Sequence, residues 1–177
     1  MLIREEDINE KAVEKVAEEM CVAARTAPKA RGADFISIAI AKGDTIDALS
    51  KKMMEIASET GAQFIERDAQ SIKLAKVVFL IGSKIRSTGV RACDYCGFDG
   101  CAEREKHLPA ICALNAGDLG IAIGSALSVA TDNRVDNRLM FSIGKAAMAL
   151  GLLGEEIKMA YGIPLSATSK NPFFDRK

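Results

Sequence analysis

The sequence has no tryptophan and only one histidine, and aromatic residues make up 5% of its 177 positions. Scarce aromatics argue against a role that depends on stacking nucleic-acid bases. Charge of one sign is not in excess either, because 24 Lys and Arg residues balance 24 Asp and Glu residues. No bulk charge therefore attracts nucleic acid or an anionic membrane. We expect neither as a partner.

Long uninterrupted hydrophobic runs are also lacking. The first twenty residues are strongly charged and do not read as a signal peptide. The longest apolar stretch, Ile111 to Ala130, is interrupted by Asn115 and Asp118, which makes it too polar to span a bilayer. We therefore expect a cytoplasmic protein. Thiols stay reduced there, so the five cysteines predict metal or redox chemistry and not a disulfide scaffold.

Length and apolar content predict one folded domain over residues 1–177. Apolar periodicity and turn residues then predict the order of its elements. Asp44 and Asp136 each precede an apolar stripe and are expected to be helix N-caps. The expected helices cover about residues 4–25, 44–60, 66–75, 112–130 and 136–150, and the expected strands cover 35–40, 77–81 and 157–166.

A segment at about residues 83–112 interrupts this order. It has little periodicity, several glycines and four of the five cysteines. A loop of about thirty residues in a compact domain is usually functional or held by something other than a core. We interpret the segment as a Cys-rich insert that binds a metal or a cluster.

The cysteines of the insert follow the pattern Cys93-x2-Cys96-x4-Cys101-x10-Cys112. Two thiolates separated by two residues can face one metal centre, and four cysteines could complete an all-sulfur ligand set. Zinc is an alternative, although zinc sites usually contain two closely spaced pairs and only one is present here. Unligated cysteines are the third alternative. Cys21 lies on the apolar stripe of the first helix and is expected to be a structural thiol.

The run Cys93-Asp-Tyr-Cys96-Gly-Phe-Asp-Gly-Cys101 resembles the 4Fe–4S domain of the corrinoid iron–sulfur protein and of electron-transport complexes in anaerobes. This resemblance implies a 4Fe–4S cluster with Cys93, Cys96 and Cys101 as ligands. That family places its fourth cysteine further downstream than Cys112. His107, the only histidine, is therefore an alternative fourth ligand.

Outside the insert, three stretches resemble the nitroreductase family. Ala27-Pro28-Lys29 is similar to its "APS" turn, with Lys29 in place of the Ser, and the helix ending Ala146-Ala147-Met-Ala-Leu150-Gly151-Leu152 is similar to its "AxxLGL". Gly162-Ile-Pro164 is similar to its late "GxP". The resemblance implies an α+β, nitroreductase-like fold, with a central sheet flanked by helices.

Nitroreductases bind FMN as dimers, so the resemblance also implies FMN as a second cofactor and a homodimer. The family's Arg-x-Ser-x-Arg phosphate motif is missing. Arg25, Lys29 and Arg31 form a basic cluster that could hold an anion or the FMN phosphate through charge-assisted hydrogen bonds, although such clusters are more often solvated surface. Arg176 and Lys177, at the basic tail, are expected to be solvent-exposed.

Taken whole, the chain resembles bacterial and archaeal proteins described as containing a ferredoxin domain, and the tail from Gly162 onward shares in that resemblance. The leading hypothesis is an iron–sulfur protein that passes electrons to a redox partner protein or a small-molecule acceptor. One alternative is an FMN-dependent, nitroreductase-like oxidoreductase. The other is a zinc-binding or redox-sensing module. Whether the chain is an enzyme, and on which substrate, is left open by the sequence.

Overall fold

The computed structural model describes residues 1–174, apart from the side chain of Glu6. Its centre is an antiparallel sheet of four strands in the order β1-β2-β4-β3. The strands are β1 (Ile36–Ala41), β2 (Val77–Lys84), β3 (Asp136–Asn137) and β4 (Ile157–Ser166). The long inner strands β2 and β4 pair along almost their whole length, with one irregularity between Ser83 and Lys84.

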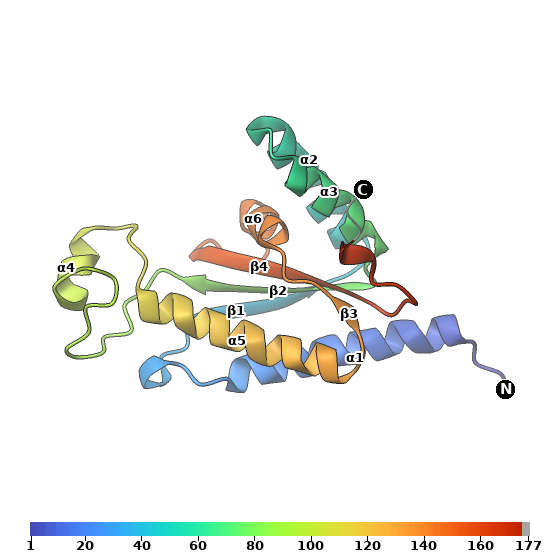
Figure 1. The fold of residues 1–177 in the computed structure, drawn as a ribbon, viewed down its shortest axis with the longest axis horizontal. Helices are drawn as coiled ribbons and strands as arrows, with labels where there is room; N and C mark the ends of the chain where they lie inside the picture. Colours follow the sequence, from blue (N-terminus) through green and yellow to red (C-terminus); the bar gives the residue numbers. More distant parts are fainter. Residues whose placement is uncertain (175–177) are drawn as a thin grey trace.

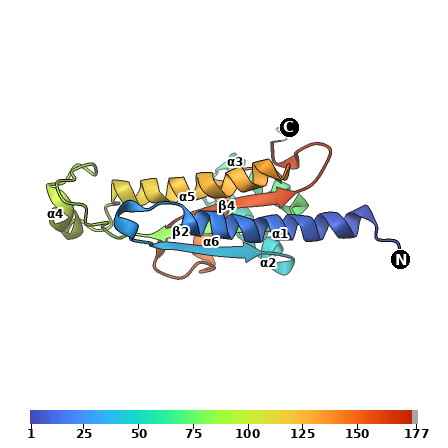
Figure 2. The ribbon, with the colours of Figure 1, turned by 90° about the horizontal axis from the view of Figure 1, so that it is seen from below.

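Helices cover both faces of this sheet (Figure 1). One face carries α1 (Glu5–Thr26) and α5 (Ala113–Asp132), which lie side by side in Figure 2. The other face carries α2 (Asp44–Thr60), α3 (Gln63–Ser71) and α6 (Phe141–Ala149). Smaller elements are α4 (Gly100–Lys106) and three single turns, η1 (Ala30–Gly32), η2 (Ile72–Leu74) and η3 (Pro172–Phe174).

Two separate hydrophobic cores follow from the alternation of side chains along a strand. In β2, Val77, Phe79 and Ile81 point to the core under α1 and α5. Val78 and Leu80 point to the core under α2, α3 and α6. All five are almost completely buried, which explains why β2 reads as a continuous apolar run and not as an alternating one.

The predicted α+β, nitroreductase-like architecture is confirmed, and β4 has the predicted bounds, 157–166. Three local predictions are wrong. The second helix begins at Asp44, but its N-cap is Gly43 and no side chain caps it. The helix expected over 136–150 is confined to α6, because Asp136 belongs to β3 and its carboxylate accepts hydrogen bonds from Thr168. The insert is not wholly loop, since it contains α4.

Within the described residues, α5 is the one helix long and apolar enough to cross a membrane by length and composition alone. The sequence argument against a membrane span relied on Asn115 and Asp118. Both side chains are buried and hydrogen-bonded to neighbouring backbone, and α5 packs along α1 over the sheet. Core helices of soluble proteins pass the same test of apolarity, so the test carries little weight here.

The contact between α6 and β4 is unusually close. A Cβ atom added to Gly144 of α6 would lie 1.9 Å from the carbonyl oxygen of Ala160, and one added to Gly162 of β4 would lie 2.2 Å from Cγ2 of Ile143. The two glycines therefore allow the helix to sit directly on the strand. Only glycine fits at Gly144 without movement of the backbone.

We expect Gly144→Ala to lower the free energy of unfolding by about 1–3 kcal/mol or more, because the added methyl group forces the backbone of α6 away from β4. Urea denaturation followed by circular dichroism measures this. Gly117→Ala is the matched control, since a Cβ at Gly117 meets nothing within 4 Å. The control should gain up to about 1 kcal/mol from helix propensity. Equal effects of the two substitutions would contradict the close contact.

Candidate metal centre

The Cys-rich insert extends away from the two layered cores. In Figure 1 the chain leaves the end of β2, passes through α4 and returns to the start of α5, beyond the end of the sheet. Among the described residues, α4 makes hardly any contact with the sheet or with the helices that flank it. The insert is therefore held mainly at its two ends, which we call the root, and much less at the part that carries Cys93, Cys96 and Cys101, which we call the tip.

Asn115 holds the root together. Its side chain is 2% exposed and lies in the first turn of α5. The amide nitrogen donates to the carbonyl oxygens of Lys84 at 2.6 Å and Arg86 at 3.2 Å, and the amide oxygen accepts from the hydroxyl of Ser83 at 2.8 Å. The end of β2 and the start of α5 are thus joined by one side chain.

A second tie links the root to the turn after α1. The guanidinium of Arg31 donates to the carbonyl oxygen of Gly89 at 2.7 Å. The backbone amide of Ala30, in the same turn, donates to the carboxylate of Asp118 on α5 at 3.0 and 3.1 Å. The turn thereby contacts both the segment that leads from β2 into the insert and α5, the helix to which the insert returns.

Cys112 is the one cysteine of the insert that lies in the root. It is 5% exposed and occupies the N-cap position of α5, with its sulfur 3.8 Å from the hydroxyl oxygen of buried Thr88. Burial raises the pKa of the Cys112 thiol. Hydrogen bonds from the backbone amides of Thr88, Asn115 and Leu114 and from the Thr88 hydroxyl together outweigh burial, so the net pKa lies below the ordinary value for a thiol.

The tip carries the other three cysteines of the insert, all half-buried and none in a disulfide. Gly97 and Gly100 have φ of +80° and +74°, so they supply the left-handed turns around Cys96 and before Cys101. In residues 1–174, no three Cys, His, Asp or Glu side chains converge closely enough to hold a metal ion. The ligand set Cys93, Cys96, Cys101 and Cys112 therefore stays a prediction.

His107, the alternative fourth ligand, follows the last residue of α4. Its Nε2 lies 3.0 Å from the carboxylate of Glu103, and its ring stacks on that of Phe98 at a centroid distance of 5.2 Å. Hydrogen bonds from Lys106 and then His107 lower the pKa of Glu103. His107 has a partner within the tip, and nothing in this arrangement tests whether it ligates a metal.

Two observations bear on whether the insert fits an iron–sulfur cluster. The donors available are thiols, the ligand type that iron–sulfur clusters use. In addition, Arg104 of α4 is 2% exposed, and its Nε–H has no hydrogen-bond partner within the described residues. A buried cation with an unused donor suits the neighbourhood of an anionic group. The residues of the insert therefore fit such a cluster by chemistry, although their thiols lie apart.

The predicted anion-binding cations have partners inside the protein. Arg25 donates to Asp34 at 2.6 Å, and Arg31 donates to Gly89 as described above. Lys29 donates to three carbonyl oxygens at the end of α1, those of Ala24, Arg25 and Ala27. These contacts account for the three charges without a ligand, and phosphate binding by them is untested. The tail residues Arg176 and Lys177 lie outside the described residues.

Burial is the largest single influence on Asp34 and raises the pKa of that carboxyl, but the other influences together outweigh it. Hydrogen bonds from the Arg25 guanidinium and the Ile36 amide, together with the charge of Lys29, hold the net pKa below its usual range. The ionised Asp34 therefore belongs to the folded turn between α1 and β1. The basic cluster stabilises local structure.

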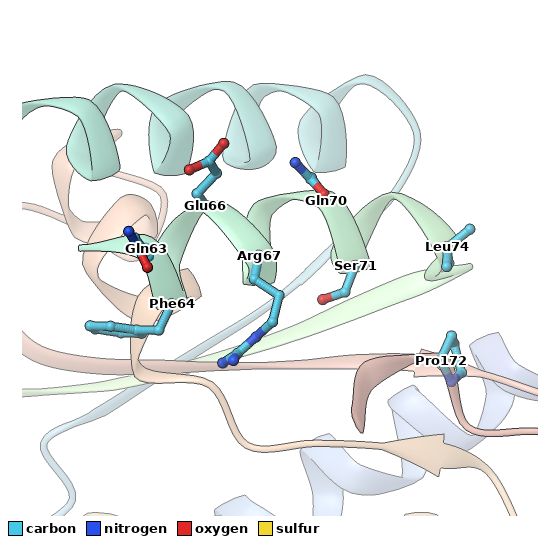
Figure 3. A pocket seen from close by; sticks show the side chains of 8 residues that line it. All are labelled: Gln63, Phe64, Glu66, Arg67, Gln70, Ser71, Leu74 and Pro172. Atoms are coloured by element: carbon cyan, nitrogen blue, oxygen red, sulfur yellow. The ribbon is translucent and has the colours of Figure 1, made fainter. Parts of the chain in front are cut away.

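One sizeable cavity lies away from the insert. It has a volume of about 780 Å³ and is lined by the outward side chains of α3 together with Pro172 of η3 (Figure 3). No cysteine lines it. Glu66 and Gln70 point to one side of α3 and Arg67 points to the other (Figure 3). We therefore place the candidate site at the insert, where the reactive side chains are.

A second cavity, of about 460 Å³, lies beside the root of the insert. It is mostly apolar and is bordered by α5, by Phe141 and Met148 of α6, and by residues 158–161 of β4. Within residues 1–174, no strand pairs with the outer side of that part of β4, and the nearest pairing is a single bridge at Gly162. Ile111 and Ala116, on either side of Cys112, line it. Lys158 is its one charged lining residue.

Sequence reasoning missed two of the residues that shape the site. The burial of Arg104 could not be predicted from the sequence, because a charged residue in a glycine-rich insert is expected to be exposed. Asn115 was visible as a polar residue in an apolar helix, which indicates a buried hydrogen bond, but its partners belong to another segment. Cys21 fits its expected role, since it is half-buried beside the core under α1 and α5, and burial raises its pKa.

The fold is similar to that of several solved structures. Nitroreductase CinD from Lactococcus lactis in complex with nicotinic acid matches with a TM-score of 0.63 and 17% identity, over 89% of this chain and 79% of that one. A BluB-like flavoprotein from Clostridium difficile 630 matches with a TM-score of 0.56 and 17% identity, over 89% and 82%. At these identities the likeness extends to the fold alone.

Sequence comparison identifies a closer relative. An "Uncharacterized protein" of Archaeoglobus fulgidus is 40% identical over 184 residues, which cover 99% of this chain and 98% of the relative. Residues 109–176 also match the family described as "Uncharacterized protein containing a ferredoxin domain (DUF2148)". The matched residues include Cys112 but not the three cysteines of the tip. On these matches, the chain belongs to this family of ferredoxin-domain-containing proteins, built on a nitroreductase-like scaffold.

Proposed function

We propose that the insert binds an iron–sulfur cluster of the 4Fe–4S type and that the protein passes electrons through it. The ligands are Cys93, Cys96 and Cys101 from the tip, with Cys112 as the fourth. The observation that carries the proposal is the placement of four of the five cysteines in one projecting segment whose ends are joined at the root. The family's ferredoxin domain supports it.

The division between root and tip suits this role. The root is fixed by buried hydrogen bonds of Asn115 and Asp118, whereas the tip has few contacts with the rest of the chain. A tip without a hydrophobic core of its own can close around a cluster, and ligand bonds then supply the free energy that packing does not. The glycines next to Cys96 and Cys101 allow backbone amides to approach the sulfurs closely.

Cys112 is favoured over His107 as the fourth ligand. A thiol must lose its proton to bind a metal, and the amides around Cys112 already favour the thiolate. His107 is engaged with Glu103 and Phe98. When bound, the cluster supplies one-electron chemistry, whereas this chain's residues set its solvent access and orientation.

Further assignments accompany the proposal. We propose that the electron partner is a redox protein or a small-molecule acceptor and that the protein acts in the cytoplasm, where free thiols persist. We also propose a homodimer, supported by the exposed apolar side chains of Ile111, Leu139 and Phe141, which line the second cavity.

A flavin-dependent reductase is the second candidate function. The apolar cavity of about 460 Å³ beside the root is within the usual range for a cofactor site, and a flavin there would lie next to the segment that ends at Cys112. Similar folds include an oxidoreductase containing FMN and a BluB-like flavoprotein. In this version of the proposal, electrons pass between the cluster and the flavin.

We expect Cys96→Ser to remove iron and acid-labile sulfide from anaerobically purified or reconstituted protein, because a ligand from the centre of the predicted set is lost. Metal analysis and a broad absorbance shoulder near about 400 nm measure the cluster. Cys21→Ser is the matched control and should retain iron, since Cys21 lies on α1, half-buried against the core under α1 and α5.

Full iron content in the Cys96→Ser variant would overturn the ligand assignment, and zinc in place of iron would favour the zinc-binding alternative. The same measurement on two further variants separates the candidates for the fourth ligand. Iron retained in His107→Ala but lost in Cys112→Ser identifies Cys112, and the reverse identifies His107.

For the flavin, we expect FMN fluorescence to be quenched saturably by the wild-type protein. Gly120→Leu should weaken binding on the order of tenfold or more, because Gly120 lines the second cavity and a leucine there occupies it. Gly117→Leu, at an exposed position one turn earlier on α5 and outside the cavity lining, should bind FMN as wild type does. Equal binding by both variants would exclude this cavity, and no quenching by wild type would exclude the flavin.

A further inference from the structure

Arg104 is the largest of the almost fully buried side chains in the protein, although it lies on α4 at the projecting insert. Its Nη1 donates to the carbonyl oxygen of Ala110 at 2.5 Å. Its Nε has no hydrogen-bond partner among the residues that the structure describes. Within residues 1–174, the one carboxylate at ion-pair distance is that of Glu105, at 3.9 Å, and it is mostly exposed to solvent.

This arrangement leaves a positive charge without adequate compensation. Burying a charge costs free energy unless it is paired and hydrogen-bonded, and a guanidinium cannot escape the cost by losing its proton. Contact with one carbonyl oxygen and a distant, solvated carboxylate meets only part of that demand. An anion bound near Arg104 would therefore stabilise its buried charge.

The position of Arg104 identifies which anion is available. Cys101 and Arg104 are three residues apart on α4, so their side chains lie on neighbouring positions of one helix face. The carbonyl oxygen that Arg104 binds belongs to Ala110, two residues before Cys112. The guanidinium thus connects the helix of one predicted ligand to the chain leading into another. Ligating cysteines are thiolates, and a cluster with four of them carries net negative charge.

We propose that Arg104 is the resident counter-cation of the cluster, and that its charge and its free Nε–H raise the reduction potential of the bound iron. This inference rests on the proposed function. Reduction adds one electron to the cluster and makes it more negative, so a nearby buried cation stabilises the reduced form more than the oxidised form. Arg104 is a positioning and tuning residue and not a ligand.

The test is the midpoint potential of anaerobically reconstituted full-length protein, titrated with dithionite in the presence of redox mediators. Arg104→Gln should hold iron and have a more negative potential than wild type. Arg104→Lys, which keeps the charge but loses the guanidinium Nε–H, should lie between the two. Lys106→Gln removes a charge from the same helix, but that side chain is 70% exposed and screened by solvent, so its potential should match wild type.

Each outcome separates the inference from the proposed function. An iron-loaded Arg104→Gln protein with the wild-type potential would overturn the counter-cation role and leave cluster binding intact. A wild-type protein that binds no iron would overturn the proposed function itself. Because α4 lies away from both cores, the circular dichroism of Arg104→Gln should be unchanged. If that variant does not load with iron, Arg104→Lys decides, and a wild-type potential in that variant would overturn the role of the Nε–H.

Discussion

A single buried amide, that of Asn115, determines how the insert is attached to the fold. It binds the carbonyl oxygen of Lys84 at the end of β2, that of Arg86 just beyond it, and the hydroxyl of Ser83 within it. The chain therefore leaves the sheet and enters α5 at the same place. Closing a loop of about thirty residues has an entropic cost that grows only slowly with length. Because the two ends are joined, packing against the sheet does not constrain the length or the sequence of the tip between them. The scaffold can therefore carry a segment that is not packed on it.

That attachment has an energetic consequence for the tip. Both hydrophobic cores end before the insert, and α4 adds almost no packing to either of them. The tip nevertheless buries the whole side chain of Arg104, which is unfavourable in a segment that contributes so little apolar contact. A ligand-bound anionic centre accounts for both features at once, because it replaces a core and compensates the charge. The thiols and the buried arginine together support such a centre more strongly than either does alone.

The sequence predicted the parts of the fold that depend on local pattern. The bounds of β4 follow from a long apolar strand between polar ends, and the helix expected over 44–60 is α2. Asp136 was misassigned because an acidic residue before an apolar stripe is also common at a strand that ends in a turn. The partners of Asn115 and the burial of Arg104 depend on segments distant in the sequence, which periodicity cannot reveal.

The nitroreductase-like scaffold supplies geometry to this site and does not dictate its chemistry. The family resemblance pointed to phosphate binding at the turn after α1. The cations of that turn instead bind backbone carbonyl oxygens: Lys29 binds the end of α1, and Arg31 binds Gly89 in the segment that leads into the insert. The same scaffold places an apolar cavity against Ile111, next to Cys112 at the root. If the insert holds the proposed cluster, whatever occupies that cavity borders the chain next to Cys112, one of the proposed ligands. Fold and insert are joined where a relay between them would have to begin.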